Sequence, residues 1–155
     1  DDYMQMYPAL VRVIHKNNGG LSSARNVGMD AARGKYVIFP DPDDWVELGY
    51  VSQMVELQNY YQTDLLCVGY YVDTDEKCVP ANEGQKPNCM DRVTAQQALL
   101  IPPKMGGFAW NKLYHLDKML NAFRANHTEI YFRDIYNFRM YHYIIYLLIR
   151  MIYFH

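Results

Sequence analysis

Short apolar runs alternate with amphipathic stretches along the chain, a pattern typical of an α/β domain. The runs at 10–14, 36–39 and 64–73 are each predicted to be strands. Residues 36–39 are apolar throughout and lie between Gly34 and Pro40, which favours a strand covered on both faces in a parallel sheet. Residues 74–90 are polar and are expected to form a loop or flap.

Helices are predicted between these runs. A short helix is expected to end at Pro8, and Ser22 or Ser23 can cap the next one, which would run to about Arg33. The spacing Asp44-Trp-Val-Glu47 is an Asp version of a capping box. Asp44 is therefore expected to be a helix cap, and the helix to end near residue 60 with these side chains buried: Trp45, Leu48, Val51, Met54 and Val55.

A further capping box at Thr94-Ala-Gln-Gln97 predicts a helix that must stop at Pro102.

Length, composition and charge limit which class of protein this can be. At 155 residues and 50% hydrophobic, the chain can bury one core, so one domain over 1–155 is predicted. A formal net charge of −2 gives no reason to expect nucleic acid as a partner.

The three cysteines have no C-x-x-C spacing, which argues against a zinc site and a disulfide framework and favours a reducing cytosol. Cys67 is predicted to be a small core residue rather than a nucleophile. No uncharged apolar run of membrane-spanning length is present, so a cytoplasmic location is expected.

Candidate chemistry lies where the strand at 36–39 ends. Asp41 and Asp43 follow it, and in open α/β sheets ligands bind at the carboxyl ends of strands. Two carboxylates at ~4 Å repel by about 4 kcal/mol at an effective dielectric near 20, so they require a cation or water. Mg²⁺ or Mn²⁺ suits such oxygen ligands. Taken alone, Asp-Pro-Asp-Asp is more typical of a solvated acidic turn.

The wider context changes this interpretation. The segment from His15 to Trp45 contains Asn-Gly-Gly-Leu-Ser-Ser-Ala-Arg-Asn-Val-Gly, then Gly-Lys-Tyr-Val-Ile-Phe, then Asp-Pro-Asp-Asp. It resembles the nucleotide-sugar half of family 2 glycosyltransferases of the GT-A fold, whose pattern is N-x-G-x-S-x-A-R-N-x-G, a G-x-[YF] strand and D-S-D-D. Pro42 stands in place of the serine.

The resemblance implies a three-layer, GT-A-like α/β fold with a mixed sheet flanked by helices. Residues 1–73 would form the nucleotide-sugar-binding part and 74–155 the acceptor side with a C-terminal helix. Family members carry a further strand, helix and strand before the run at 10–14, so the domain is expected to be N-terminally incomplete.

The implied activity is transfer of a hexosyl or N-acetylhexosaminyl group from a nucleotide sugar to an acceptor hydroxyl, metal-dependent and inverting, as in polysaccharide biosynthesis. The acceptor would be a glycan or lipid-linked. Asp43 and Asp41 would hold Mg²⁺ or Mn²⁺, with Asp41 on the metal or the ribose. Arg25 and Asn26 lie in the first turn of a helix that follows a glycine turn, a site suited to a diphosphate. On its own, Arg25 is better interpreted as a surface cation, and the ligand role is favoured only in combination with Asp41 and Asp43.

Two acceptor-side residues complete the predicted site. Phe108 and Trp110 suggest an aromatic platform for sugars, although core packing is the more common role of a single Trp. Asp134 resembles the catalytic base of the family, but Arg133 stands where these enzymes carry Glu. A neighbouring cation would lower the pKa of Asp134 and weaken the base. A helix N-cap is an equally supported role for Asp134.

Several alternatives remain open from the sequence. The apolar segment 135–155 is either a core helix or a helix in peripheral contact with the cytoplasmic face of a membrane. A homodimer is compatible with the sequence. The functional alternatives are a nucleotidyltransferase and a non-catalytic binding or interaction domain.

Overall fold

The structure, a computed structural model, describes residues 1–81, 88–99 and 108–125. The expectations for Asp134 and for the C-terminal helix fall on residues outside these ranges. Within the described ranges, no helix combines the length and apolarity that a membrane span requires.

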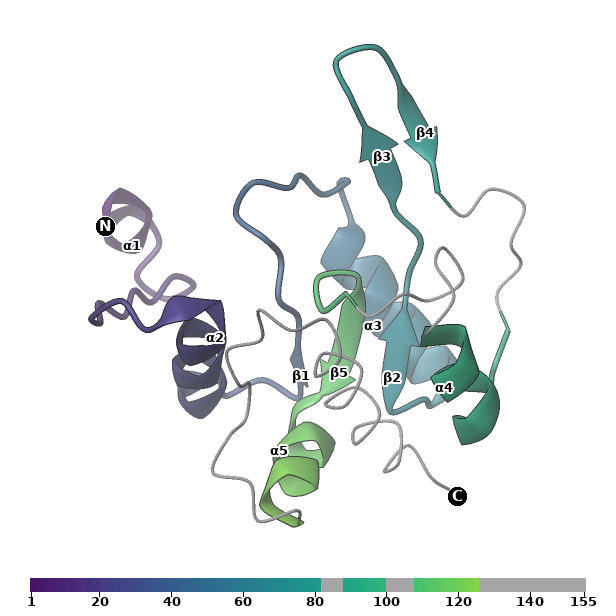
Figure 1. Ribbon diagram of the computed structural model, residues 1–155. Helices are drawn as coiled ribbons and strands as arrows, with labels where there is room; N and C mark the ends of the chain where they lie inside the picture. The colour runs from purple at the N-terminus through teal and green to yellow at the C-terminus, as the bar shows by residue number, and fades with distance from the viewer. Residues whose placement is uncertain (82–87, 100–107, 126–155) are drawn as a thin grey trace.

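A three-stranded sheet lies at the centre of the molecule (Figure 1). Its order is β1 (Tyr36–Val37), β5 (Lys112–His115) and β2 (Leu65–Cys67), and β5 is antiparallel to both neighbours. The outer strands β1 and β2 therefore run in the same direction on either side of β5. The expected parallel neighbour of β1 is not found among the described residues, and β1 is half-buried rather than covered on both faces.

The core gathers around β5. Leu113 and Tyr114 are buried, and the Tyr114 ring meets Phe39 edge to face with centroids 5.8 Å apart. Behind the sheet in Figure 1, α3 (Tyr50–Tyr61) contributes the buried Met54. The last described helix, α5 (Leu116–Ala125), follows β5 directly and buries Met119. The strand with the greatest burial is thus the last strand in the described sequence.

Lys112 is the most buried side chain of β5, with 0% of its surface exposed. Its Nζ donates to the backbone oxygen of Phe108 at 2.6 Å and to Asn111 Oδ1 at 2.8 Å. Burial lowers the pKa of Lys112 to about 8, and nearby Cys67 partly opposes this. Cys67 is half-buried, and burial raises the pKa of its thiol.

The helices that follow residues 19 and 49 begin elsewhere than predicted. The helix α2 (Gly20–Ala31) starts before Ser22, because Asn18 Oδ1 accepts a hydrogen bond from the N–H of Gly20 at 3.0 Å. The prediction that Asp44 caps α3 is wrong, since α3 follows Gly49, whose φ is 82°. Residues 41–44 instead form a turn, in which the N–H of Asp44 donates to the backbone oxygen of Asp41 at 3.2 Å.

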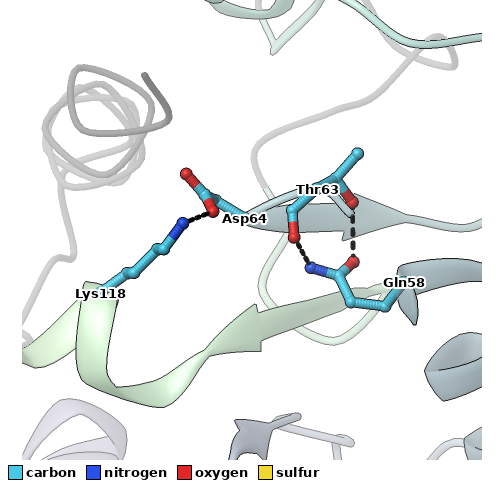
Figure 2. Close-up of polar contacts among 4 residues, drawn as sticks. All are labelled: Gln58, Thr63, Asp64 and Lys118. Carbon is cyan, nitrogen blue, oxygen red and sulfur yellow. Dashed lines mark hydrogen bonds and ion pairs between the residues drawn. The ribbon is translucent and has the colours of Figure 1, made fainter. Parts of the chain in front are cut away.

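The late start of α3 exposes side chains that the pattern assigned to the core: Trp45, Leu48 and Val51. After α3, the chain turns into β2 through Gln62, whose φ is 53°. Figure 2 shows how polar contacts hold this turn. The buried Gln58 accepts from Thr63 Oγ1 at 2.9 Å and donates to the backbone oxygen of Thr63, while Asp64 forms an ion pair with Lys118 of α5.

The predicted strand at 64–73 is divided into β2 and β3 (Tyr71–Asp73), with the exposed Gly69 between them. Part of the predicted loop at 74–90 forms β4 (Cys78–Pro80), which pairs antiparallel with β3. The hairpin projects beyond the sheet (Figure 1). The chain therefore leaves the sheet after β2 to build a separate two-stranded arm.

The N-terminal region differs from its prediction in one respect. The short helix α1 (Asp2–Met6) forms as expected, but residues 10–14 are not a strand. Leu10 is 85% exposed, and no described strand lies alongside to pair with this run. An apolar run cannot remain a strand without a hydrogen-bonding neighbour.

The helix α4 (Arg92–Leu99) is capped by Asp91, not by the predicted box at Thr94. Asp91 Oδ1 accepts from the N–H of Thr94 at 2.8 Å, and this hydrogen bond lowers the pKa of Asp91.

We expect Asp91→Ala to lower the thermal unfolding midpoint and the matched Asp44→Ala to leave it unchanged, because, of these two residues, only Asp91 caps a helix. Calorimetry of both variants checks this, and equal shifts would contradict the assignment.

Lys112 generates a second prediction. Because its pKa is lowered in the folded state, the unfolded chain binds the proton more tightly, and stability rises with pH between about 8 and the ordinary value of 10.5. The free energy of unfolding of the wild type, relative to Lys112→Met, should therefore increase by roughly 1 to 3 kcal/mol across that window. Urea titrations at several pH values measure the difference. Lys77→Met, at an exposed position, is the control, and a flat difference for Lys112 would refute the effect.

Candidate active site

A cavity of about 780 Å³ lies beyond the carboxyl end of β1. Its walls come from the β1–α3 connection, one side of α3, the β2–β3 connection with the hairpin, and the segment before β5. The described lining residues are Pro40, Asp41, Asp43, Asp44, Trp45, Val46, Glu47, Tyr50, Gln53, Met54, Leu57, Val68, Gly69, Tyr70, Tyr71, Val72, Asp73, Pro80, Trp110 and Asn111. The volume lies within the range of about 300 to 1,000 Å³ that is usual for small-molecule sites.

The charge of this cavity is acidic. Carboxylates line it at positions 41, 43, 44, 47 and 73, and the described lining residues include no Lys or Arg. An anionic ligand such as a diphosphate would be repelled unless a cation accompanied it. The described ranges contain no cluster of three or more His, Cys, Asp or Glu side chains that could hold a metal ion.

Arg25 and Asp41 form an ion pair across the edge of the site. Arg25 of α2 donates to Asp41 Oδ1 at 2.9 Å, with side chains 8% and 30% exposed. The Arg25 guanidinium also lies 5.9 Å from the centre of the Phe39 ring. Arg25 thus orients Asp41 and is not among the described lining residues, while Asn26 is half-buried on the same helix. Contact of either residue with a diphosphate stays a prediction.

Asp43 is placed differently from Asp41. It is exposed, lines the cavity, and has no hydrogen-bond or ion-pair partner among the described residues. Two carboxylates of which one is unengaged suit Mg²⁺ or Mn²⁺, since Mg²⁺ commonly takes one or two carboxylates and completes its coordination with water and substrate phosphates. The residues present therefore fit a metal that arrives with a phosphorylated ligand.

The sequence left Trp110 open between an aromatic platform and core packing, and it assigned Trp45 to the core. Trp110 is half-buried, with Phe108 stacked on it at 5.2 Å and the edge of Tyr70 at 5.0 Å. Trp45, predicted to be in the core, is 54% exposed in the cavity. Both tryptophans line the cavity, but Trp110 is held largely by other aromatic rings.

Polar contacts fix the base of the cavity. The Tyr50 hydroxyl donates to the backbone oxygen of Trp110 at 2.9 Å, and burial raises the pKa of Tyr50. Asn111 Nδ2 donates to the backbone oxygen of Val68 at 3.1 Å. Lys112 in turn donates to Asn111, so the buried lysine supports this side of the cavity from below.

Sequence reasoning missed the contribution of the hairpin. Glu47, Tyr71 and Asp73 line the cavity, although they were expected in a helix, in a strand and at a strand end. The alternation of Tyr71 and Asp73 on one face of a strand is the signal that could have suggested a shared surface.

The sequence matches glycosyl transferase family 2 over residues 1–145. The chain belongs to this family. This confirms the family resemblance read from the motifs at 15–45, and the family carries with it the GT-A nucleotide-sugar transferase fold. The three-layer arrangement in detail stays a prediction.

Relatives named as glycosyltransferases include EpsH and EpsJ of Bacillus subtilis (strain 168). EpsH is 35% identical over 117 residues, which cover 74% of this chain and 33% of EpsH. EpsJ is 33% identical over 117 residues, covering 74% of this chain and 34% of EpsJ. GlyA of Streptococcus pneumoniae is 32% identical over 109 residues, 65% of this chain and 16% of GlyA. The chain spans about a third of the length of EpsH and EpsJ.

The ion pair generates a matched prediction. Asp41→Asn removes the carboxylate partner of the buried Arg25 and should lower the free energy of unfolding by roughly 1 to 3 kcal/mol. Asp43→Asn, at an exposed carboxylate, should change it by less than about 0.5 kcal/mol. Urea unfolding of both variants measures the difference. Equal destabilisation would mean that the Arg25–Asp41 pair does not hold the edge of the site.

Proposed function

We propose that this chain forms the catalytic region of a metal-dependent, inverting glycosyltransferase that moves a hexosyl or N-acetylhexosaminyl group from a nucleotide sugar to a glycan or lipid-linked acceptor. The observation that carries the proposal is the acidic cavity beyond β1, lined by Asp41 and Asp43, in a chain of glycosyl transferase family 2.

Asp43 and Asp41 would contact different parts of the bound donor and its metal. Asp43 would be the main protein ligand of Mg²⁺ or Mn²⁺, because its carboxylate is unengaged within the described ranges. Asp41, oriented by Arg25, would contact the metal or the ribose. The metal, when bound, neutralises negative charge on the departing nucleoside diphosphate.

The transfer step requires a protein group that acts as a base and removes the proton of the acceptor hydroxyl. Asp134, outside the described residues, is the proposed group that takes the proton from the acceptor hydroxyl. The hydroxyl oxygen then forms the bond to the anomeric carbon as the bond to the diphosphate oxygen breaks, and the diphosphate leaves with the electron pair. Attack from the face opposite the leaving group inverts the anomeric centre.

Calorimetry tests the metal assignment. We expect the wild type to bind UDP only in the presence of Mn²⁺, since the cavity otherwise repels a diphosphate. Asp43→Asn should weaken the combined binding at least roughly tenfold, as loss of a metal-site interaction does. Asp44→Asn is the matched control, because this carboxylate also lines the cavity but has no assigned metal role.

The outcomes separate the candidate functions. Equal affinity of Asp43→Asn and the wild type would remove Asp43 from the metal site. Binding of UDP with Mn²⁺, but no turnover with any of a panel of nucleotide sugars, would favour the non-catalytic binding domain over the enzyme.

A further inference from the structure

The hairpin wall of the cavity holds two aromatic rings open to solvent. Trp45 and Tyr71 stack with ring centres 5.9 Å apart and planes at 19°. The indole N–H of Trp45 donates to Asp73 Oδ2 at 2.9 Å. Both rings line the cavity, with Trp45 54% and Tyr71 47% exposed. A stack and a hydrogen bond therefore fix the orientation of aromatic surface that the fold does not bury.

Core packing does not account for this arrangement. Burying an aromatic ring is strongly favourable, and Trp110 in the same cavity is covered by Phe108 and Tyr70. Trp45 instead joins the β1–α3 connection to the hairpin through Tyr71 and Asp73 while 54% of its surface remains exposed. The C–H face of a sugar ring is apolar and its rim is polar, so it matches an aromatic face bordered by hydrogen-bond acceptors.

The border of this surface is acidic. Asp73 Oδ2 accepts the hydrogen bond from the Trp45 indole, and Glu47 lines the same cavity as Tyr71, where its negative charge raises the pKa of the Tyr71 hydroxyl. Carboxylates accept hydrogen bonds from sugar hydroxyls. They repel a carboxylate or phosphate on the ligand, and no Lys or Arg among the described lining residues offsets that repulsion.

We propose that Trp45, Tyr71 and Asp73, termed the hairpin platform, bind a sugar ring of the acceptor, and that the surrounding carboxylates restrict this ring to sugars without negative charge. The inference rests on the proposed transferase function, because it assigns the substrate class of the same cavity. It places the acceptor sugar on the hairpin side and the donor on the Asp43 side.

Tryptophan fluorescence can test the platform without catalysis, because the chain contains two Trp residues. Trp110→Phe leaves Trp45 as the reporter, and Trp45→Phe leaves Trp110. The probes are α-1,4-galactobiose and α-1,4-digalacturonic acid, which differ only by oxidation at C6. We expect Trp45 emission to respond to galactobiose at millimolar concentration. Each carboxylate about 7 Å away weakens binding of an anion roughly threefold in a water-like dielectric, so digalacturonic acid should bind about tenfold more weakly.

Matched variants separate stacking from charge. Tyr71→Ala should abolish galactobiose binding, whereas Tyr60→Ala, at an exposed aromatic on α3 outside the cavity, should not. Glu47→Gln should reduce the preference for galactobiose over digalacturonic acid. Asp75→Asn, with the same loss of charge on the hairpin turn but outside the cavity, should leave the preference unchanged. The preference should also shrink as salt is raised.

The outcomes decide between the two proposals. Absence of a Trp45 response to galactobiose, or equal affinity for both disaccharides, would overturn the hairpin platform. The same proteins are titrated with UDP and Mn²⁺. If galactobiose does not bind but UDP still binds with Mn²⁺, only the hairpin platform is wrong. If galactobiose binds but UDP does not, the proposed donor site is wrong instead.

Discussion

The described structure depends on the insertion of β5 between β1 and β2. These strands are far apart in sequence, and β5 supplies the hydrogen bonds that β1 and β2 do not make with each other. Its residues are the most buried in the sheet, and α5 continues directly from it. This position buries the Lys112 ammonium, whose side chain is 0% exposed, and burial of a charge is unfavourable. Hydrogen bonds to the Phe108 carbonyl and the Asn111 side chain offset that free-energy cost.

This insertion also assembles the cavity. Trp110 and Asn111, the residues just before β5, line the same cavity as the acidic turn that follows β1. Tyr50 of α3 donates a hydrogen bond to the backbone oxygen of Trp110, and the backbone oxygen of Val68, after β2, accepts one from the Asn111 side chain. The stability of the core and the shape of the site are therefore coupled through the same few residues.

The carboxylates that line the cavity differ in what they contact. Asp41 is neutralised by Arg25, Asp43 is unengaged within the described ranges, and Asp73 is turned to the indole of Trp45. In the proposed function, a diphosphate would enter with a cation, while an uncharged sugar would approach the hairpin without one. One acidic cavity would then bind both the anionic donor and the neutral acceptor.

The sequence by itself determined the α/β class, the family, the position of the acidic turn after a strand, the approximate extents of α1 and α2, and the end of α3. These follow from local signals: periodicity, glycine and proline, and a compound motif within thirty-one consecutive residues, 15–45. The tertiary structure decided what depends on distant partners. It left 10–14 without a strand neighbour among the described residues, began α3 at Tyr50, and paired Asp41 with Arg25. It also buried Lys112 and opened Trp45, because burial is set by which segments meet across the fold and not by the hydrophobicity of a residue alone.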